Sequence, residues 1–161
     1  SMGRAVGVLL LFVLFGTLVS GPAFARDRVE RIAGWRVASG GTGDGGRLVS
    51  LSRRGRGYAF EHYLEFWRGN GGVVIGASFR NGDCRSGDAS AIVPFEQGMG
   101  RETFDERLAD YLRACPLPLA EADAFRRSLD AVWPRFAALA ERARAAMEAE
   151  NEAIARHGET D

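Results

Sequence analysis

The segment from Tyr58 to Arg80 restricts the fold more than any other part of the chain. Apolar and polar residues alternate from Tyr58 to Trp67, which is the pattern of a β-strand with one buried side. A glycine-rich stretch around Asn70-Gly71 follows, and then an apolar run from Val73 to Arg80. Asn-Gly tolerates the positive φ angles of a tight turn, so we expect an antiparallel hairpin here.

A two-residue loop at Asn70 and Gly71 fixes the register of this hairpin. On the inner side it places Phe66 opposite Ile75, Leu64 opposite Ala77 and His62 opposite Phe79. On the outer side it pairs Trp67 with Val74, Tyr63 with Ser78 and Glu61 with Arg80. The expected hairpin therefore has an apolar row on one face and an opposite-charge pair on the other, as cross-strand energetics favour.

Further strands are expected on both sides of the hairpin. The run Leu48–Ser52 joins it through the turn Arg54–Gly57, and weaker candidates are Ile32–Val37 and Ala91–Phe95. The glycine-rich segment Gly40–Gly46 is interpreted as a flexible loop between strands, because a single Gly-Asp repeat is too short for a calcium-binding β-roll. These segments predict an antiparallel meander of four to five strands, which needs a cover on its apolar face.

The cover is expected to be helical. Thr103 and Glu106 have the spacing of a capping box, and Pro116 would stop the helix that follows. Its apolar stripe comprises Phe104, Leu108, Tyr111, Leu112 and Cys115.

A second helical pattern follows, with a kink or break expected near Trp133 and a new segment beginning at Pro134. Its stripe comprises Phe125, Leu129, Val132, Phe136, Leu139, Ala143 and Met147. Residues 148–161 lose this stripe and are expected to form a polar, frayed tail. The predicted fold is thus a single α+β domain over residues 26–147, in which two to three C-terminal helices pack on the meander.

Residues 1–25 have the pattern of an export signal rather than of a folded element. Ser1 is interpreted as a cloning remnant, Arg4 supplies the positive charge, and Ala5–Val19 are almost wholly apolar. That run covers roughly 22 Å as a helix, short of the roughly 30 Å of a bilayer core. Small residues precede a cleavage site expected after Ala25, so no stable membrane span is expected afterwards.

Export gives the two cysteines a structural interpretation. Cys84 and Cys115 are the only cysteines, and an oxidising compartment favours a disulfide between them. Such a bond stabilises a fold by roughly 3 to 4 kcal/mol in the chain-entropy model. A reactive role is the alternative, although neither cysteine lies in a Cys-x-x-Cys motif or near a histidine in sequence.

Few residues are typical of catalysis. His62 is the only histidine of the predicted domain and lies in an apolar row, which is more typical of a core residue than of a general base. Glu61 and Glu65 would point to the opposite face and could not orient it. We find no nucleophile motif, phosphate loop or metal-ligand spacing, so the sequence predicts no metal and no cofactor.

Two groups of residues are the candidate binding sites. The first comprises Arg53, Arg54, Arg56 and Tyr58, which suit an anionic partner. The second comprises Tyr63 and Trp67 on the expected outer face, because aromatic residues beside charge are typical of interfaces. The alternatives are solvated turn arginines for the first group and a covering helix for the second.

These observations predict a periplasmic or secreted, non-enzymatic interaction module. Its partner would be another envelope protein or an anionic envelope component, and a homodimer through the C-terminal helix is a further possibility. Nucleic acid is not expected as a partner, because the basic and acidic residues cancel to zero net charge. The alternative functions are a carrier with an apolar pocket between sheet and helices, and a hydrolase that uses His62.

Overall fold

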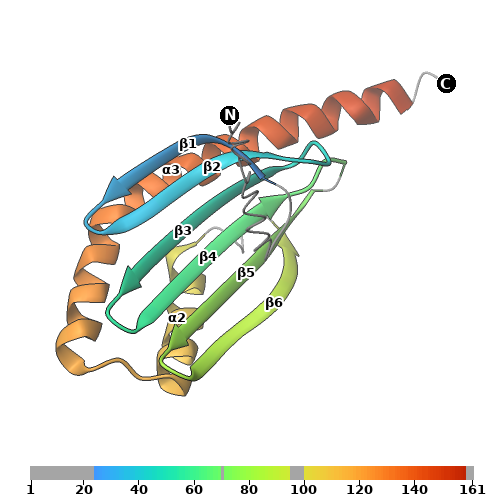
Figure 1. Cartoon of the computed structure of the whole chain (residues 1–161). Helices are drawn as coiled ribbons and strands as arrows, with labels where there is room; N and C mark the ends of the chain where they lie inside the picture. Colours follow the sequence, from blue (N-terminus) through green and yellow to red (C-terminus); the bar gives the residue numbers. More distant parts are fainter. Residues whose placement is uncertain (1–23, 70, 95–99, 159–161) are drawn as a thin grey trace, which may run out of the picture.

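A computed structural model describes residues 24–69, 71–94 and 100–158 (Figure 1). The described residues form six strands followed by two helices. In chain order these are β1 (Phe24–Ile32), β2 (Trp35–Thr42), β3 (Arg47–Gly55), β4 (Tyr58–Phe66), β5 (Gly72–Asn81), β6 (Cys84–Pro94), α2 (Arg101–Ala114) and α3 (Leu119–Gly158). Each strand pairs antiparallel with its neighbour in sequence, which confirms the α+β class and the antiparallel meander.

The sheet has six strands instead of the predicted four to five. The segment Ile32–Val37, expected to be one strand, contains the turn between β1 and β2. Ala33 and Gly34 occupy this turn with φ angles of 50° and 82°, as a tight hairpin requires. The pattern did not indicate β1 because it is a charged edge strand with one partner, and such strands lack a regular apolar alternation.

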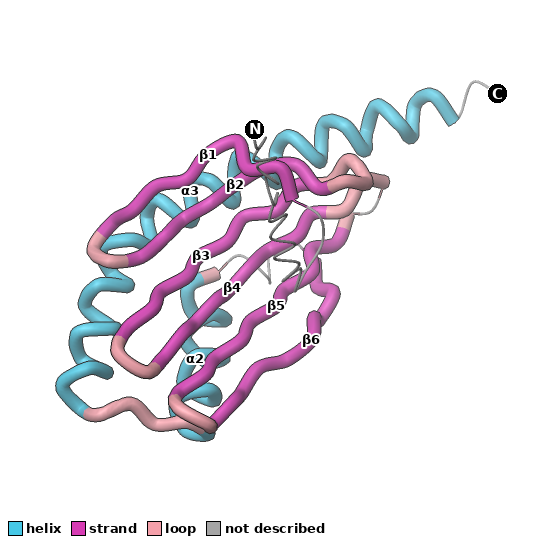
Figure 2. The backbone as a smooth tube through the Cα atoms, viewed as in Figure 1, coloured by secondary structure: helices cyan, strands magenta, loops and turns pink. Residues whose placement is uncertain are grey.

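Both helices lie on the same face of the sheet, which we call the inner face (Figures 1 and 2). Alternation along the strands sends every second side chain to this face, and the helix stripes meet them there. The buried strand residues include Trp35, Val37, Val49, Leu51, Tyr58, Phe60, Leu64, Phe66, Val73, Ile75 and Phe79. The expected stripe of α3 is buried throughout, and so is that of α2 except for the half-buried Leu112.

The β4–β5 register differs from the predicted one by two residues. Phe66 faces Val73, and Phe60 rather than His62 faces Phe79. The connection is longer than an Asn-Gly turn because β4 ends at Phe66 and β5 begins at Gly72, and Gly69 has a φ of 80°. A shift of two residues leaves every side chain on its expected face, so the burial prediction holds although the pairings were wrong.

Helix α2 begins three residues earlier than the capping box predicts. Arg101 is its first residue, and Gly100 is the N-cap without a side-chain cap bond. Thr103 lies inside the first turn. The helix ends at Ala114, before Pro116, as predicted.

Helix α3 is one helix, so the described residues contain two C-terminal helices and no separate segment at Pro134. Figure 1 shows that it changes direction along its length while it follows the sheet. It also continues as a helix from Met147 to Gly158, and the first part of this extension contacts the β4–β5 connection. Arg68 forms an ion pair with Glu150 at 3.0 Å, and Asn151 accepts a hydrogen bond from the backbone N–H of Gly69.

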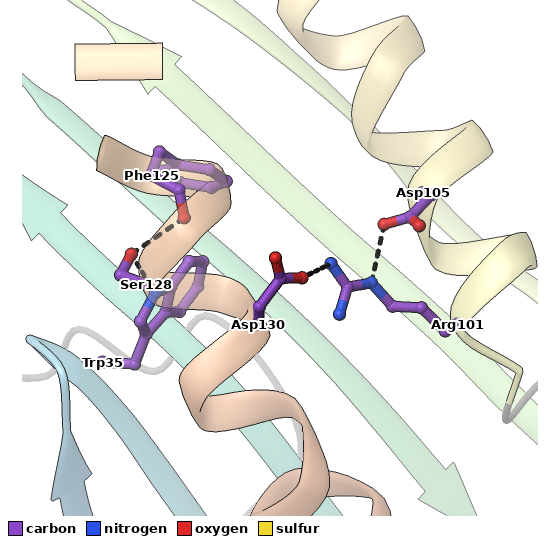
Figure 3. Close-up of polar contacts among 6 residues, drawn as sticks. All are labelled: Trp35, Arg101, Asp105, Phe125, Ser128 and Asp130. Carbon is purple, nitrogen blue, oxygen red and sulfur yellow. Dashed lines mark hydrogen bonds and ion pairs between the residues drawn. The ribbon is translucent and has the colours of Figure 1, made fainter. Parts of the chain in front are cut away.

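Polar contacts fasten the helices to the sheet and to each other (Figure 3). The Trp35 indole N–H donates to the Ser128 hydroxyl at 2.8 Å, which in turn donates to a backbone carbonyl of α3. Arg101 of α2 donates to Asp105 and to Asp130 of α3, each at 2.8 Å. The buried indole is thereby satisfied, and an ion-pair network joins the two helices.

The cysteine pairing is confirmed. The sulfur atoms of Cys84, at the start of β6, and Cys115, just after α2, lie 2.01 Å apart. This bond joins one end of α2 to the edge of the sheet.

Candidate functional site

The predicted arginine cluster divides between the two faces of the sheet. Arg53 is directed toward the helices, where its Nε donates to the Tyr58 hydroxyl at 3.0 Å and its guanidinium donates to the Ala33 carbonyl at 2.7 Å. Its guanidinium carbon also lies 5.9 Å from the centre of the Trp35 ring. Arg53, which is half-buried, and the buried Tyr58 therefore make contacts within the fold.

Arg54 and Arg56 are exposed, and Arg54 lies on the other face of the sheet, which we call the outer face. Neither α2 nor α3 lies on this face (Figure 2). Strand pairing sets Arg54 opposite Ala59, Ala59 opposite Arg80, and Arg80 opposite Arg85. Arg54, Arg80 and Arg85 thus form one cross-strand row, which we call the arginine row.

Sequence reasoning missed Arg80 and Arg85 as site residues. The predicted register placed Arg80 opposite Glu61, which would have neutralised it, whereas the observed register places Ser78 opposite Glu61. The available signal was that arginines lie beside both the β3–β4 turn and the β5–β6 turn, but only the correct β4–β5 register shows that they form one row.

At the opposite end of the outer face, three side chains of β4 and its continuation form a second group, which we call the aromatic end: Tyr63, Glu65 and Trp67. Tyr63 and Trp67 are half-buried, as expected for the outer face. The Tyr63 ring covers Gly76 of β5, where a Cβ atom would lie 2.1 Å from its Cζ. Glu65 is only 9% exposed and accepts a hydrogen bond from the Trp67 side chain.

The electrostatics of the aromatic end disfavour the charged form of Glu65. Burial raises the pKa of the Glu65 carboxyl, the Trp67 hydrogen bond partly opposes this, and the negative charge of Asp44 raises it further. Leu48 and Val74 flank Glu65 on the neighbouring strands, and Ile92 of β6 is 57% exposed in the same row. Leu48 and Val74 are themselves buried, so the exposed apolar side chain of this row is Ile92, beside a carboxylate that lacks full solvation.

His62 lies on the inner face and is 3% exposed. Its ring packs edge-on against Phe104 at 4.8 Å and Phe136 at 5.7 Å between ring centres. This is the position of a core histidine. A general base must reach a substrate, so the enclosure of the ring weighs against catalysis.

Within the described ranges, no group of three or more potential metal ligands occurs, and no helix is long and apolar enough to cross a membrane. Compared with known proteins, the chain matches no family model, no curated protein and no solved structure.

Proposed function

We propose that this chain is an exported, non-enzymatic interaction module that binds a partner protein through the aromatic end of its outer face. The observation that carries the proposal is the arrangement of Tyr63 and Trp67 around the buried Glu65, on the sheet face where neither helix packs. Aromatic side chains bury much apolar area with few rotatable bonds, which is why they dominate the binding energy of many interfaces.

The charge of the aromatic end indicates the chemistry of the partner. Glu65 and the nearby Asp44 make this end acidic, and burial removes part of the solvation of the Glu65 carboxylate. An arginine or lysine side chain of the partner would supply donors and positive charge, while neighbouring apolar side chains would pack on Tyr63 and Trp67. We therefore propose a partner protein with a basic residue set among apolar ones.

The alternatives receive less support from the inner face. A carrier needs space between sheet and helices, but Phe60 contacts the rings of Trp35, Phe79, Phe104 and Phe125 at centre distances of 5.6 to 6.3 Å. This aromatic packing fills the layer in which a ligand would lie. A hydrolase would need an accessible His62, and that ring is enclosed.

Export is part of the proposal, and the cysteine pair is compatible with it. The expected cleavage after Ala25 falls within β1, so it would remove the pairs of Phe24 and Ala25 and leave those from Arg26 to Ile32. Mass analysis of the protein from its native host should find Arg26 at the N-terminus. Finding Met2–Ala25 still attached would contradict export by cleavage.

The interface is tested with the Tyr63→Ala/Trp67→Ala double variant. A partner is first captured from an envelope extract with the wild type, purified, and titrated against each variant by calorimetry. We expect the double variant to bind at least about tenfold more weakly, because each truncation removes a central aromatic contact.

Leu119→Ala is the matched control, since Leu119 is an exposed apolar residue of α3. It should bind like the wild type, and circular dichroism should show all three proteins folded. Equal affinity of the double variant and the wild type would refute the aromatic end as the interface.

A further inference from the structure

The arginine row contains one of the two directly opposed arginine pairs in the described strands, the other being Arg31 and Arg36 of β1 and β2. Arg80 and Arg85 are directly opposite each other on β5 and β6, and Arg54 lies in the same row beyond Ala59. Like charges directly opposite in a sheet are destabilising. A bound anion would offset this repulsion.

Several arginines in other parts of the molecule are paired with carboxylates. Arg135 forms a two-pronged contact with Glu30 at 2.6 and 2.8 Å, and Arg101 contacts Asp105 and Asp130. In the described part of the chain, no carboxylate lies within ion-pair distance of any member of the arginine row. Two acidic groups are near in the sheet: Glu61, one row away, and Asp83, in the β5–β6 turn, both exposed.

The geometry of the row determines which anion it suits. Cβ atoms of directly opposed residues lie about 5 Å apart, so the guanidinium groups of Arg80 and Arg85 can converge on one anionic group. A tetrahedral phosphate offers oxygens to both groups, whereas a single guanidinium fork already occupies the two oxygens of a carboxylate. Arg54 lies about 10 Å from Arg80 across two strand spacings, above the small side chain of Ala59, and can hold a second phosphate.

We propose that the arginine row is a binding site for a soluble anion that carries two or more phosphate groups. One phosphate is held by Arg80 and Arg85 and another by Arg54, while Arg56 on the adjoining turn adds positive charge. The site is independent of the proposed protein interface, because it uses different residues at the other end of the outer face.

The test uses sodium tripolyphosphate and orthophosphate as probes, with the melting temperature and calorimetry as readouts. Tripolyphosphate should raise the melting temperature of the wild type by several degrees, bind at least about tenfold more tightly than orthophosphate, and bind more weakly as NaCl increases. Equal affinity for the two probes would overturn the two-phosphate assignment.

The decisive variant is Arg85→Ser, with Arg126→Ser on α3 as the control of equal charge change at an exposed site. Without anion, Arg85→Ser should melt at a higher temperature than the wild type, because it removes the like-charge pair. It should also lose at least about tenfold in tripolyphosphate affinity, whereas Arg126→Ser should keep it. Equal losses in both variants would show only an effect of net charge and would overturn the site.

Whether the bound phosphate belongs to a lipid headgroup instead of a soluble anion is tested separately with phosphatidylglycerol vesicles. Wild-type protein that co-sediments with these vesicles but does not bind tripolyphosphate would overturn the soluble anion. Tyr63→Ala/Trp67→Ala should bind tripolyphosphate normally, so failure of one proposal is distinguishable from failure of the other.

Discussion

The two faces of the sheet are made by the same six strands and have opposite properties. The inner face presents Trp35, Phe60 and Phe79 to two helices, and the Phe60 ring packs T-shaped against Trp35 and tilted against Phe79. The outer face has aromatic residues and a poorly solvated acid at one end and a cross-strand row of exposed arginines at the other. Because alternation assigns side chains to both faces at once, one set of strands supplies both the core and the candidate recognition surface.

Among the variants that test this difference between the faces, Phe60→Ala should lower the stability of the fold most. Phe60 is buried among four aromatic rings, so its truncation should lower the free energy of unfolding by about 3 to 5 kcal/mol. Tyr63→Ala, three residues along on the outer face, should cost much less. Urea denaturation of both variants measures the difference, and equal losses would show that the outer face also belongs to the core.

Removal of the disulfide should have the second-largest effect on stability, because this bond holds α2 against the edge of the sheet. Cys84→Ser/Cys115→Ser should lower the free energy of unfolding by about 2 to 4 kcal/mol. Hydrogen exchange should accelerate first in α2 and β6, with β3 and β4 still protected. Uniform acceleration across the sheet would contradict a local role of the bond.

Gly76→Ala should disturb the outer face alone. The added Cβ would overlap the Tyr63 ring, so the ring must move, at a cost of about 1 to 3 kcal/mol. Weaker partner binding should accompany this change. Gly71→Ala is the matched control, since nothing lies within 4 Å of its added Cβ. An unaltered tyrosine signal in near-ultraviolet circular dichroism for Gly76→Ala would contradict the contact.

The smallest expected effects are pH-dependent and opposite in sign on the two faces. Burial raises the pKa of Glu65 on the outer face, so the folded state loses stability as pH rises from the unfolded pKa through the higher folded pKa. Glu65→Gln should therefore be more stable than the wild type at pH 7 and equal to it at low pH.

On the inner face, the hydrogen bonds from Arg135 lower the pKa of Glu30, which stabilises the fold above the unfolded pKa. That stability is lost as pH falls through the folded pKa, so Glu30→Gln should be less stable than the wild type at pH 7 and equal to it at low pH. Thermal melts from pH 3 to pH 8 measure the stability of both variants. A change of stability in the same direction for Glu65→Gln and Glu30→Gln at pH 7 would contradict the opposite pKa shifts of the two acids.

Face assignments were predictable from the sequence, whereas pairings were not. His62, Tyr63 and the stripe of α3 lie on the expected faces, because alternation and helical periodicity depend only on local spacing. The β4–β5 register depends on the conformation of one connection, and an error of two residues there hid the arginine row. Strand β1 was missed for a different reason, since its pairing with β2 rests on backbone hydrogen bonds and not on an apolar pattern.

The order of elements along the chain has a consequence for synthesis. A ribosome releases all six strands before either helix, so the meander can close hairpin by hairpin through short-range contacts. Its aromatic side then has no covering layer until the last third of the chain emerges. An apolar sheet face without its covering layer is prone to aggregation, and docking of the helices removes that exposure.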